Sequence, residues 1–367
     1  MIRDIVEYYV HRELIDRKRP FYRFINQKEF KNIFLNKQIL FTNPECWRDQ
    51  ASDSLEVYFE TMENDKEHLR KIWKHLREAE ESKYKRLGID YLSFDNAVFL
   101  NYVAAIAVIQ QKSYVYCVAD TIRDKMMFNE YHMNYGRNII IKFAPDFYTK
   151  IAMMKGTGLL RGDYLFADFM PMIYVKDMDE YIENRLHNGI TAQQVAQSYF
   201  DEGAFLKHSK FAYEHEYRMK LRIKKEEIGL STIFHELYDA LWQENDEEII
   251  LDYSVKKIAD VSDRINLIYN EIDDRILKDG SKEFFVIDIR GNLNDMIEKV
   301  YIHKGEDKMV KDKIRKICAD QKVPIDEADF ENYLWMSIGS ACYFALCHDT
   351  GSACCFVPIC PQEDFGL

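Results

Sequence analysis

The sequence lacks the short motifs that mark several common enzyme classes. It has no G-x-x-x-x-G-K-[S/T] loop and no G-x-G-x-x-G turn, the glycine-rich loops that hold nucleotide and dinucleotide phosphates. It also has no H-E-x-x-H helix and no G-x-S-x-G elbow, which zinc proteases and α/β-hydrolases use. These absences disfavour a P-loop nucleotide kinase, a Rossmann dehydrogenase, a zincin and an α/β-hydrolase.

The sequence also lacks a long apolar run. The longest near-apolar stretch, residues 97–109, contains Asn101 and Tyr102 and is too short to span a bilayer. The first residues, Met1 to Asp4, lead into mixed charged and apolar residues without the apolar segment of a signal peptide. We therefore predict a soluble, cytoplasmic protein that makes no contact with a membrane.

The sequence has fewer basic than acidic residues. The chain has 50 Lys and Arg residues against 62 Asp and Glu residues, which gives a formal net charge of −12. A general nucleic-acid binder needs a basic face that displaces counterions from the phosphates. We therefore expect no general nucleic-acid binding, although the composition leaves a local basic groove open.

The material for a hydrophobic core is ample. Apolar residues make up 47% of the 367 residues and aromatic residues 14%, so disorder is disfavoured. Short strands alternate irregularly with helices of unequal length, which indicates an α+β fold with a mixed or antiparallel central sheet. Strands are predicted at 21–24, 38–42, 113–119, 138–143, 172–176, 284–289 and 299–303. Helices are predicted at 1–19, after Asn26, and at 60–87, 95–110, 125–134, 178–200, within 224–280 and at 308–320. Asn26 and Glu29 fit a capping box, and the helix at 60–87 has an apolar stripe of Leu69, Ile72, Trp73 and Leu76.

The stretch 205–222, FLKHSKFAYEHEYRMKLR, is the most informative part of the chain. Read with a period of two, it predicts a strand with Glu214, Glu216 and Arg218 on one face and aromatic or apolar residues on the other. Such an ionic row is typical of a solvated sheet face with cross-strand ion pairs. It is also compatible with a site in which one carboxylate acts and the arginine orients it.

Five of the eight cysteines crowd the C-terminal end of the chain, at Cys342, Cys347, Cys354, Cys355 and Cys360. Together with His348 they offer enough ligands for one zinc ion, but their spacing is not that of paired C-x2-C knuckles. The neighbouring residues are apolar and fit a packed tail. We therefore predict reduced cysteines in a cytosolic chain and no metal site.

Three separated segments carry residues that together could hold a dinucleotide. An arginine binds phosphate or ribose, an aromatic ring stacks on nicotinamide, and a glutamate accepts from a ribose hydroxyl and stabilises positive charge at the anomeric carbon. The candidates are Arg23 and Tyr22 on an early strand, Tyr131 and Tyr135 at the end of a helix, and Glu216 and Glu214 in the stretch 205–222.

Four motifs in this order resemble the bacterial domain of unknown function numbered 2971. They are YRF at 22–24 followed by the strand and turn up to Trp47-Arg48-Asp49, then Tyr116-Cys117 with MFNEY at 127–131, then FLKHSKFAYEHEYR at 205–218, and EKVYIHKGEDKMV at 298–310. The third resembles the family signature F-x-K-x-x-x-F-x-x-E-x-E-x-R closely. The sequence departs from the family pattern at Gln50, Ser52 and Phe128, where proline, an acidic residue and tryptophan are usual.

The resemblance implies a family core at about 20–59, 111–224 and 284–325, with helical insertions at about 60–110 and 225–283. We therefore predict a single elaborated α+β domain over 1–325 and a cysteine-rich tail over 326–367. Members of the family are similar to proteins of bacterial defence and abortive infection. The order Arg, Tyr, Glu on separated segments resembles, by analogy of arrangement, the layout of ADP-ribosyltransferases.

Two interpretations follow. The chain is an NAD-using, ADP-ribosyltransferase-like defence effector, with Glu216 and Glu214 as catalytic carboxylates, Arg23 and Tyr22 holding the dinucleotide, and Tyr131 or Tyr135 stacking. Alternatively, it is a non-catalytic sensor or scaffold in which the Glu/Arg row is a structural network. Either one implies a macromolecular target or partner protein. The sequence does not predict the oligomeric state.

Overall fold

The chain folds around a ten-stranded mixed, mostly antiparallel sheet, as an α+β protein. The structure is a computed structural model that describes residues 19–43, 66–89, 96–112, 114–122, 125–156, 165–187, 194, 202–223, 235–270, 276–279 and 282–330. Within these ranges, no helix is long and apolar enough to cross a bilayer.

Eight strands of the sheet follow the order β12-β11-β4-β1-β3-β2-β10-β9, while β8 pairs with β3 and β5 pairs with β8. Of the pairings in this sheet, only β11 with β12 is parallel. A separate parallel pair joins β6 to β7. The strands are β1 (Phe21–Ile25), β2 (Gln38–Thr42), β3 (Tyr114–Ala119), β4 (Ile139–Phe143), β5 (Leu165–Pro171), β6 (Ile173–Val175), β7 (Leu206–His208), β8 (Glu216–Ile223), β9 (Ile276–Asp279), β10 (Lys282–Asp288), β11 (Ile297–His303) and β12 (Ile325–Ala328).

The sheet divides at β3. One edge of β3 pairs with β8 along the whole strand, from Tyr114 to Ala119. The other edge meets β1 only at Ala119, opposite Tyr22, and meets β2 only at Val115, opposite Thr42. Because β1 and β2 reach opposite ends of the same edge, the middle of that edge lies between two diverging strands.

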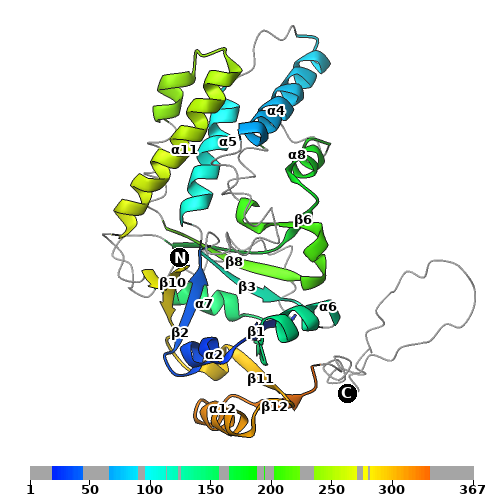
Figure 1. Cartoon of the computed structure of the whole chain (residues 1–367), viewed down its shortest axis with the longest axis vertical. Coiled ribbons are helices and arrows are strands. Elements are labelled where there is room, and N and C mark those ends of the chain that lie inside the picture. Colours follow the sequence, from blue (N-terminus) through cyan, green and yellow to red (C-terminus); the bar gives the residue numbers. More distant parts are fainter. Residues whose placement is uncertain are drawn as a thin grey trace, which may run out of the picture.

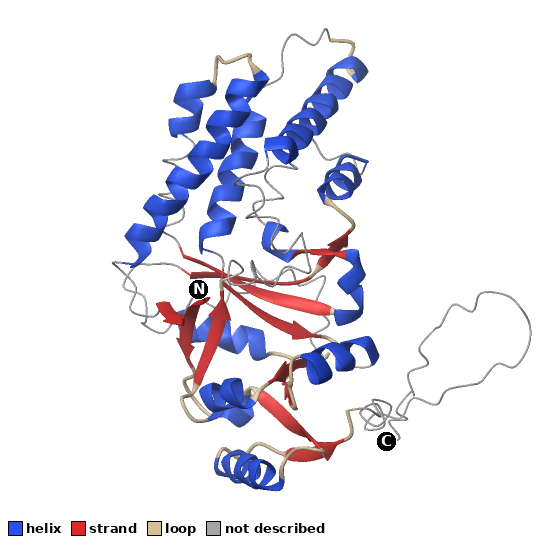
Figure 2. Cartoon of the chain, in the orientation of Figure 1, coloured by secondary structure: helices blue, strands red, loops and turns tan. Residues whose placement is uncertain are grey.

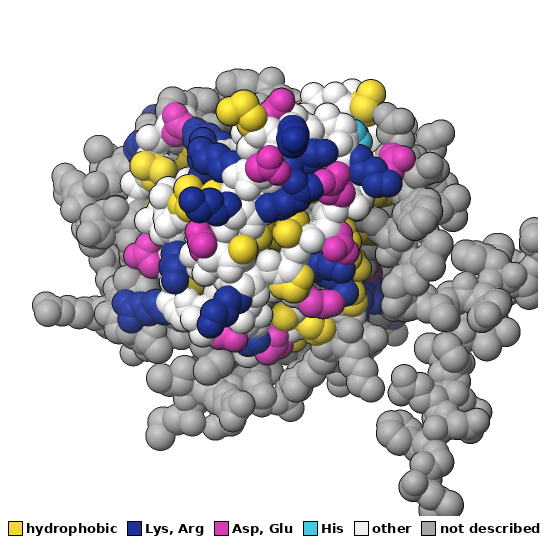
Figure 3. Space-filling model, turned by 90° about the horizontal axis from the view of Figure 1, so that it is seen from below, with side chains coloured by type: hydrophobic (Ala, Val, Ile, Leu, Met, Phe, Trp, Pro, Cys, Tyr) yellow, Lys and Arg dark blue, Asp and Glu magenta, His cyan; other side chains and the backbone are white. Residues whose placement is uncertain are grey.

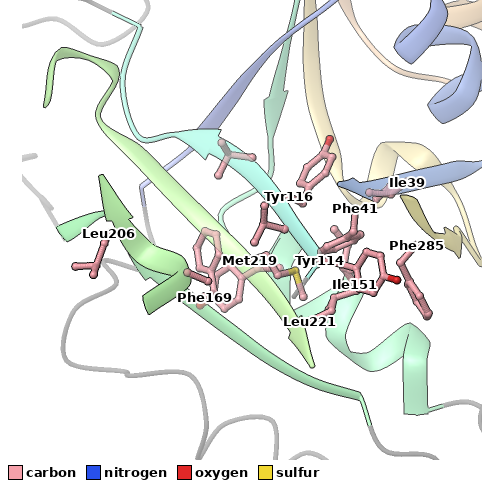
Figure 4. Packing of buried hydrophobic residues seen from close by; sticks show 14 of the residues in the cluster. Ile39, Phe41, Tyr114, Tyr116, Ile151, Phe169, Leu206, Met219, Leu221 and Phe285 are labelled. Carbon is pink, nitrogen blue, oxygen red and sulfur yellow. The ribbon is translucent and has the colours of Figure 1, made fainter. Parts of the chain in front are cut away.

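Aromatic and β-branched residues build the core on which this sheet rests, as expected for strands of this composition. Phe21 on β1 contacts the rings of Phe147 and Phe169 at centroid distances of 5.7 and 5.1 Å. Figure 4 shows residues of β2, β3, β5 and β8 converging in the same cluster. Tyr114 and Met219 are buried there at 0% and 1% exposure.

Helices from two distant parts of the chain form one group. α4 (Lys66–Arg86), α5 (Asn96–Lys112) and α11 (Glu247–Asn270) stand together on one side of the sheet (Figure 1). The apolar stripe of α4 is buried as predicted, at Leu69, Ile72, Trp73 and Leu76. Lys66 bridges from α4 to Glu248 and Asp252 of α11 at 2.5 and 2.8 Å. The segments interpreted as two insertions thus contact each other.

The remaining helices lie closer to the sheet (Figure 2). They are α2 (Gln27–Phe34), α6 (Lys125–Phe128), α7 (Phe147–Gly156), α8 (Met178–His187) and α12 (Lys308–Asp320). A short helix at 235–241 instead belongs to the group of α4, α5 and α11, where Asn96 of α5 donates to the Glu244 carbonyl that follows it at 2.7 Å. The capping box predicted for α2 is present, since the Asn26 side chain accepts from the Glu29 amide at 2.9 Å. Asp307 caps α12 in the same way, accepting from Met309 and Val310.

α12 and β12 form one end of the molecule, which Figure 3 views directly. Basic and acidic side chains are interleaved over this face. Lys299 pairs with Asp326 at 2.5 Å, and Lys311 pairs with Glu327 at 3.2 Å. The face is therefore a mixed, internally paired surface rather than a basic one.

The structure differs from the prediction for regular structure in several places. The stretch 205–222 is not one strand, because β7 ends at His208, Ser209–Glu214 form a 3₁₀ helix, and β8 begins at Glu216. Strands β5, β9 and β12 were not predicted, and β9 lies within 224–280, where helix was expected. The predicted helix at 1–19, the turn at Cys46–Asp49 and the cysteine tail after 330 lie outside the described residues, apart from Arg19.

Candidate functional site

A cavity opens where the sheet divides. Its wall is made by β1, β3, the start of β8 and the helical segment after α6. The volume is about 40 Å³, which is room for a few water molecules and far below the roughly 300 Å³ of the smallest usual ligand pockets. The lining residues are Tyr22, Arg23, Phe24, Cys117, Val118, Ala119, Met127, Tyr131, Arg137, Glu214 and Glu216.

Arg23 bridges the gap between β1 and β3. Its Nη1 donates to the Cys117 carbonyl at 2.5 Å, and its Nη2 donates to Glu29 Oε1 at 3.0 Å. The guanidinium lies 4.2 Å from the centroid of the Tyr116 ring. Burial opposes its charge, but Tyr116 and Glu29 outweigh burial and raise the pKa of Arg23. Arg23 thus supplies the hydrogen bond that a neighbouring strand would give the middle of β3.

Two carboxylates and two cations form a buried network beside Arg23. Lys207 Nζ lies 2.5 Å from Glu214 Oε2 and 2.8 Å from Glu216 Oε2. Arg218 Nε donates to Glu216 Oε1 at 2.6 Å, and its Nη1 donates to the Ala204 carbonyl at 3.0 Å. All four side chains are exposed by 8% or less. The interpretation of this row as a solvated sheet face is therefore wrong.

Both oxygens of Glu216 are occupied, which fixes its protonation state. Burial alone would raise the pKa of Glu216, but Arg218 and Lys207 outweigh burial and hold it well below its usual value. Glu216 is consequently ionised near neutral pH. It can accept hydrogen bonds and stabilise positive charge, but it cannot serve as a general acid near neutral pH.

Backbone geometry places the two glutamates together. His215, between them, has a φ of 45° in the left-handed region, which is uncommon for a residue with a side chain. This residue ends the 3₁₀ helix and starts β8, so that Glu214 and Glu216 both reach Lys207. The predicted strand register for Glu214 is thus wrong, while the proximity of the two carboxylates is present. Such strained residues are concentrated at functional sites.

A π-helix, Asn129–Asn134, continues α6 and carries Tyr131. Wide turns of this kind occur frequently at functional sites. The Tyr131 ring stacks on Phe24, with centroids 5.4 Å apart and planes 16° apart. Burial, with Glu214 as the next cause, raises the pKa of Tyr131 well above its usual value. The stack on Phe24 holds the Tyr131 ring against the wall of the cavity.

Five of the six predicted site residues line the cavity, namely Tyr22, Arg23, Tyr131, Glu214 and Glu216. Tyr135 does not line it, but lies next to Tyr131 with its ring centroid 6.3 Å away and 55% exposed. Arg137 and Cys117 also line the cavity and were missed as site residues. Their positions depend on the turn after the π-helix and on the division of the sheet, for which the sequence carries no local signal.

Cys117 carries the one thiol among the lining residues, and we expect it to be unreactive. Burial, with the Glu216 carboxylate as the next cause, raises the pKa of the Cys117 thiol well above its usual value, and thiolate is the reactive form. Alkylation at pH 8, followed by mass spectrometry of the peptide that contains Cys117, should give less than about a tenth of the labelling seen after unfolding. Equal labelling of native and unfolded protein would contradict the assigned environment.

Three or more His, Cys, Asp or Glu side chains placed to hold a metal ion do not occur together in the part of the chain that the structure describes. Comparison with known proteins found no matching family profile, no matching curated protein and no matching solved structure. The resemblance to the domain of unknown function 2971 therefore rests on the four sequence motifs alone, and function is argued from the cavity itself.

Proposed function

We propose that the protein is an NAD-using enzyme of the ADP-ribosyltransferase type and that the cavity between β1, β3 and β8 is its site. The observation that carries this proposal is the convergence of Arg23, Tyr131 and Glu216, from three distant segments, on one cavity. If these residues form a binding site, they must lie together in the fold. If they were unrelated surface residues, nothing would bring them to the same cavity. The π-helix and the strained His215 favour a functional site at the same place.

The residues suit this chemistry in their protonation states. Transfer of ADP-ribose breaks the bond between nicotinamide and the anomeric carbon; nicotinamide leaves with the bonding pair, and positive charge develops on the ribose. Glu216 is permanently anionic and can stabilise that charge or accept from a ribose hydroxyl. When the wall opens and the Tyr131 ring separates from Phe24, that ring offers an aromatic surface for nicotinamide. The acceptor is a nucleophile on a macromolecular target or, failing that, water.

The volume sets a condition on this proposal. About 40 Å³ does not admit a nicotinamide ribosyl group, so NAD binds only if the wall formed by the π-helix moves away from β1. The wall contains few main-chain ties to β1, since the aromatic stack of Tyr131 on Phe24 and the contact of Arg137 with the Phe24 carbonyl at 3.3 Å join them. We propose that this wall opens on binding.

Thermal unfolding with and without NAD tests the proposal. A ligand that binds only the folded state stabilises it by RT ln(1 + [L]/Kd), about 4 kcal/mol at 1,000 times Kd. We expect millimolar NAD to raise the unfolding midpoint by several degrees, and nicotinamide riboside, which lacks the diphosphate and the adenosine, to raise it less. An unchanged midpoint at millimolar NAD would reject the proposal.

A second function is favoured by a specific observation. Within the described residues, both oxygens of the Glu216 carboxylate are bonded to cations, Lys207 and Arg218, and the Cys117 thiol also contacts this carboxylate. Saturation of this kind suits a non-catalytic scaffold in which the network fixes β8 against β7. On that account, replacement of network residues lowers stability but changes no NAD-dependent property.

A further inference from the structure

Arg137 stands at the cavity in a different state from Arg23. It follows Gly136, whose φ of 60° turns the chain out of the π-helix, and its amide donates to the Tyr131 carbonyl at 3.0 Å. Its guanidinium lies 5.2 Å from the ring centroid of Tyr131 and 5.9 Å from that of Tyr135. Two aromatic faces therefore hold the side chain in place at the wall of the cavity.

Stacking uses the faces of a guanidinium and leaves its five N–H donors in the plane. Only Nη1 of Arg137 is engaged among the described residues, by the Phe24 carbonyl at 3.3 Å. No described carboxylate forms an ion pair with it, and Glu29, the acid whose pKa it lowers, is bonded to Arg23 at 3.0 Å. Arg23, in contrast, has both terminal nitrogens engaged within the protein.

A second donor lies beside Arg137. The Tyr131 hydroxyl has no hydrogen-bond partner among the described residues, while its ring is fixed against Phe24. Glu214 and Glu216 line the same cavity, but Lys207 and Arg218 balance their charge. Among the described residues, the cavity therefore presents a guanidinium that no carboxylate pairs with and a phenol hydroxyl that bonds no protein group. A guanidinium is a strong, bidentate donor to phosphate oxygens, and the hydroxyl can add a further hydrogen bond.

We propose that Arg137 and the Tyr131 hydroxyl form an anion subsite that binds a phosphate or diphosphate group of the ligand. The inference deepens the proposed function and rests on the same cavity: the diphosphate of NAD lies at Arg137, and Arg23 is a positioning residue that holds β1 to β3. The guanidinium is preorganised by two rings, so little side-chain entropy is lost when the anion binds.

Titration calorimetry with inorganic pyrophosphate tests the subsite directly. We expect one binding site in the wild type and a loss of affinity of at least about tenfold in Arg137→Met, because bidentate, charge-assisted hydrogen bonds disappear. Arg137→Lys should recover only part of the loss, since an ammonium cannot form the fork. Arg77→Met, which removes an exposed arginine of α4 that also lies over a ring, Trp73, should bind as the wild type does.

The outcomes separate this inference from the proposed function. If pyrophosphate and NAD bind equally well to the wild type and to Arg137→Met, the subsite is wrong although the NAD site stands. If pyrophosphate binds in an Arg137-dependent way and NAD does not bind, the subsite stands and the ligand is another phosphate compound. If pyrophosphate does not bind to the wild type at millimolar concentration, the subsite is wrong. Unfolding midpoints of each variant confirm that it is folded.

Discussion

Replacing Arg218 with methionine should lower the free energy of unfolding by about 3–5 kcal/mol, because one partner of a buried ion pair is removed and the other keeps its charge. Arg218 is 2% exposed, bonds Glu216 Oε1 at 2.6 Å and bonds the Ala204 carbonyl at 3.0 Å. Methionine replaces the aliphatic part of the arginine side chain but not its guanidinium, so the loss reports on the missing charge and its hydrogen bonds to Glu216 and Ala204. Urea unfolding monitored by circular dichroism measures it.

The matched control is Lys74→Met on α4. Lys74 approaches Glu78 only at 3.9 Å, and both side chains are more than half exposed, so we expect a stability close to that of the wild type. Equal losses in Arg218→Met and Lys74→Met would show that the network around Glu216 is no more important than a surface pair. The account of a buried, charge-balanced cavity wall would then be wrong.

The second large effect concerns the chemistry. Glu216→Gln should reduce the release of nicotinamide from NAD by a factor of about 10²–10³, the usual effect of removing one group that stabilises transition-state charge. Glutamine retains the size of the side chain but not its negative charge. NAD affinity should change by only a few-fold, since Arg137 and the aromatic wall are unchanged. Single-turnover assays and a binding titration separate the two quantities.

The pH dependence sharpens this prediction. Because Arg218 and Lys207 hold the pKa of Glu216 well below its usual value, the carboxylate does not titrate between pH 5 and 8. The rate of nicotinamide release in the wild type should therefore show no acidic limb in that range. Glu298→Gln, on the exposed side of β11, serves as the control and should retain full activity. A rate equal to wild type in Glu216→Gln would remove Glu216 from the chemistry.

Much of the fold could be predicted because its signals are local. The helix α12 was expected at 308–320, where the structure has it, since an apolar stripe at helical spacing marks its extent. The capping box of α2 and the strands β2 and β4 were predicted for similar reasons. β12 could not be predicted. It is a four-residue strand, IDEA, that pairs in parallel with β11, and neither its length nor its composition distinguishes it from a loop.

The site was predicted in part for a different reason. Residue type and order indicated Arg23, Tyr131 and Glu216, but a sequence period assumes extended backbone. The prediction that Glu214 lies on a strand was therefore wrong, because His215, in the left-handed region, separates a 3₁₀ helix from β8. Burial of the ionic row was also not predictable, because alternation shows which residues share a face and not what covers it. Arg137 reaches the cavity only through the π-helix and the turn at Gly136.

The most direct test of the central claim is an NAD titration by calorimetry on the wild type and on Ala119→Val. Ala119 lines the cavity on β3 and is 4% exposed, and valine suits a strand while filling the space without removing a polar group. We predict one NAD site in the wild type and none in Ala119→Val, with both proteins folded. Equal binding by the two proteins, or no binding by the wild type, would contradict the assignment of the cavity as the NAD site.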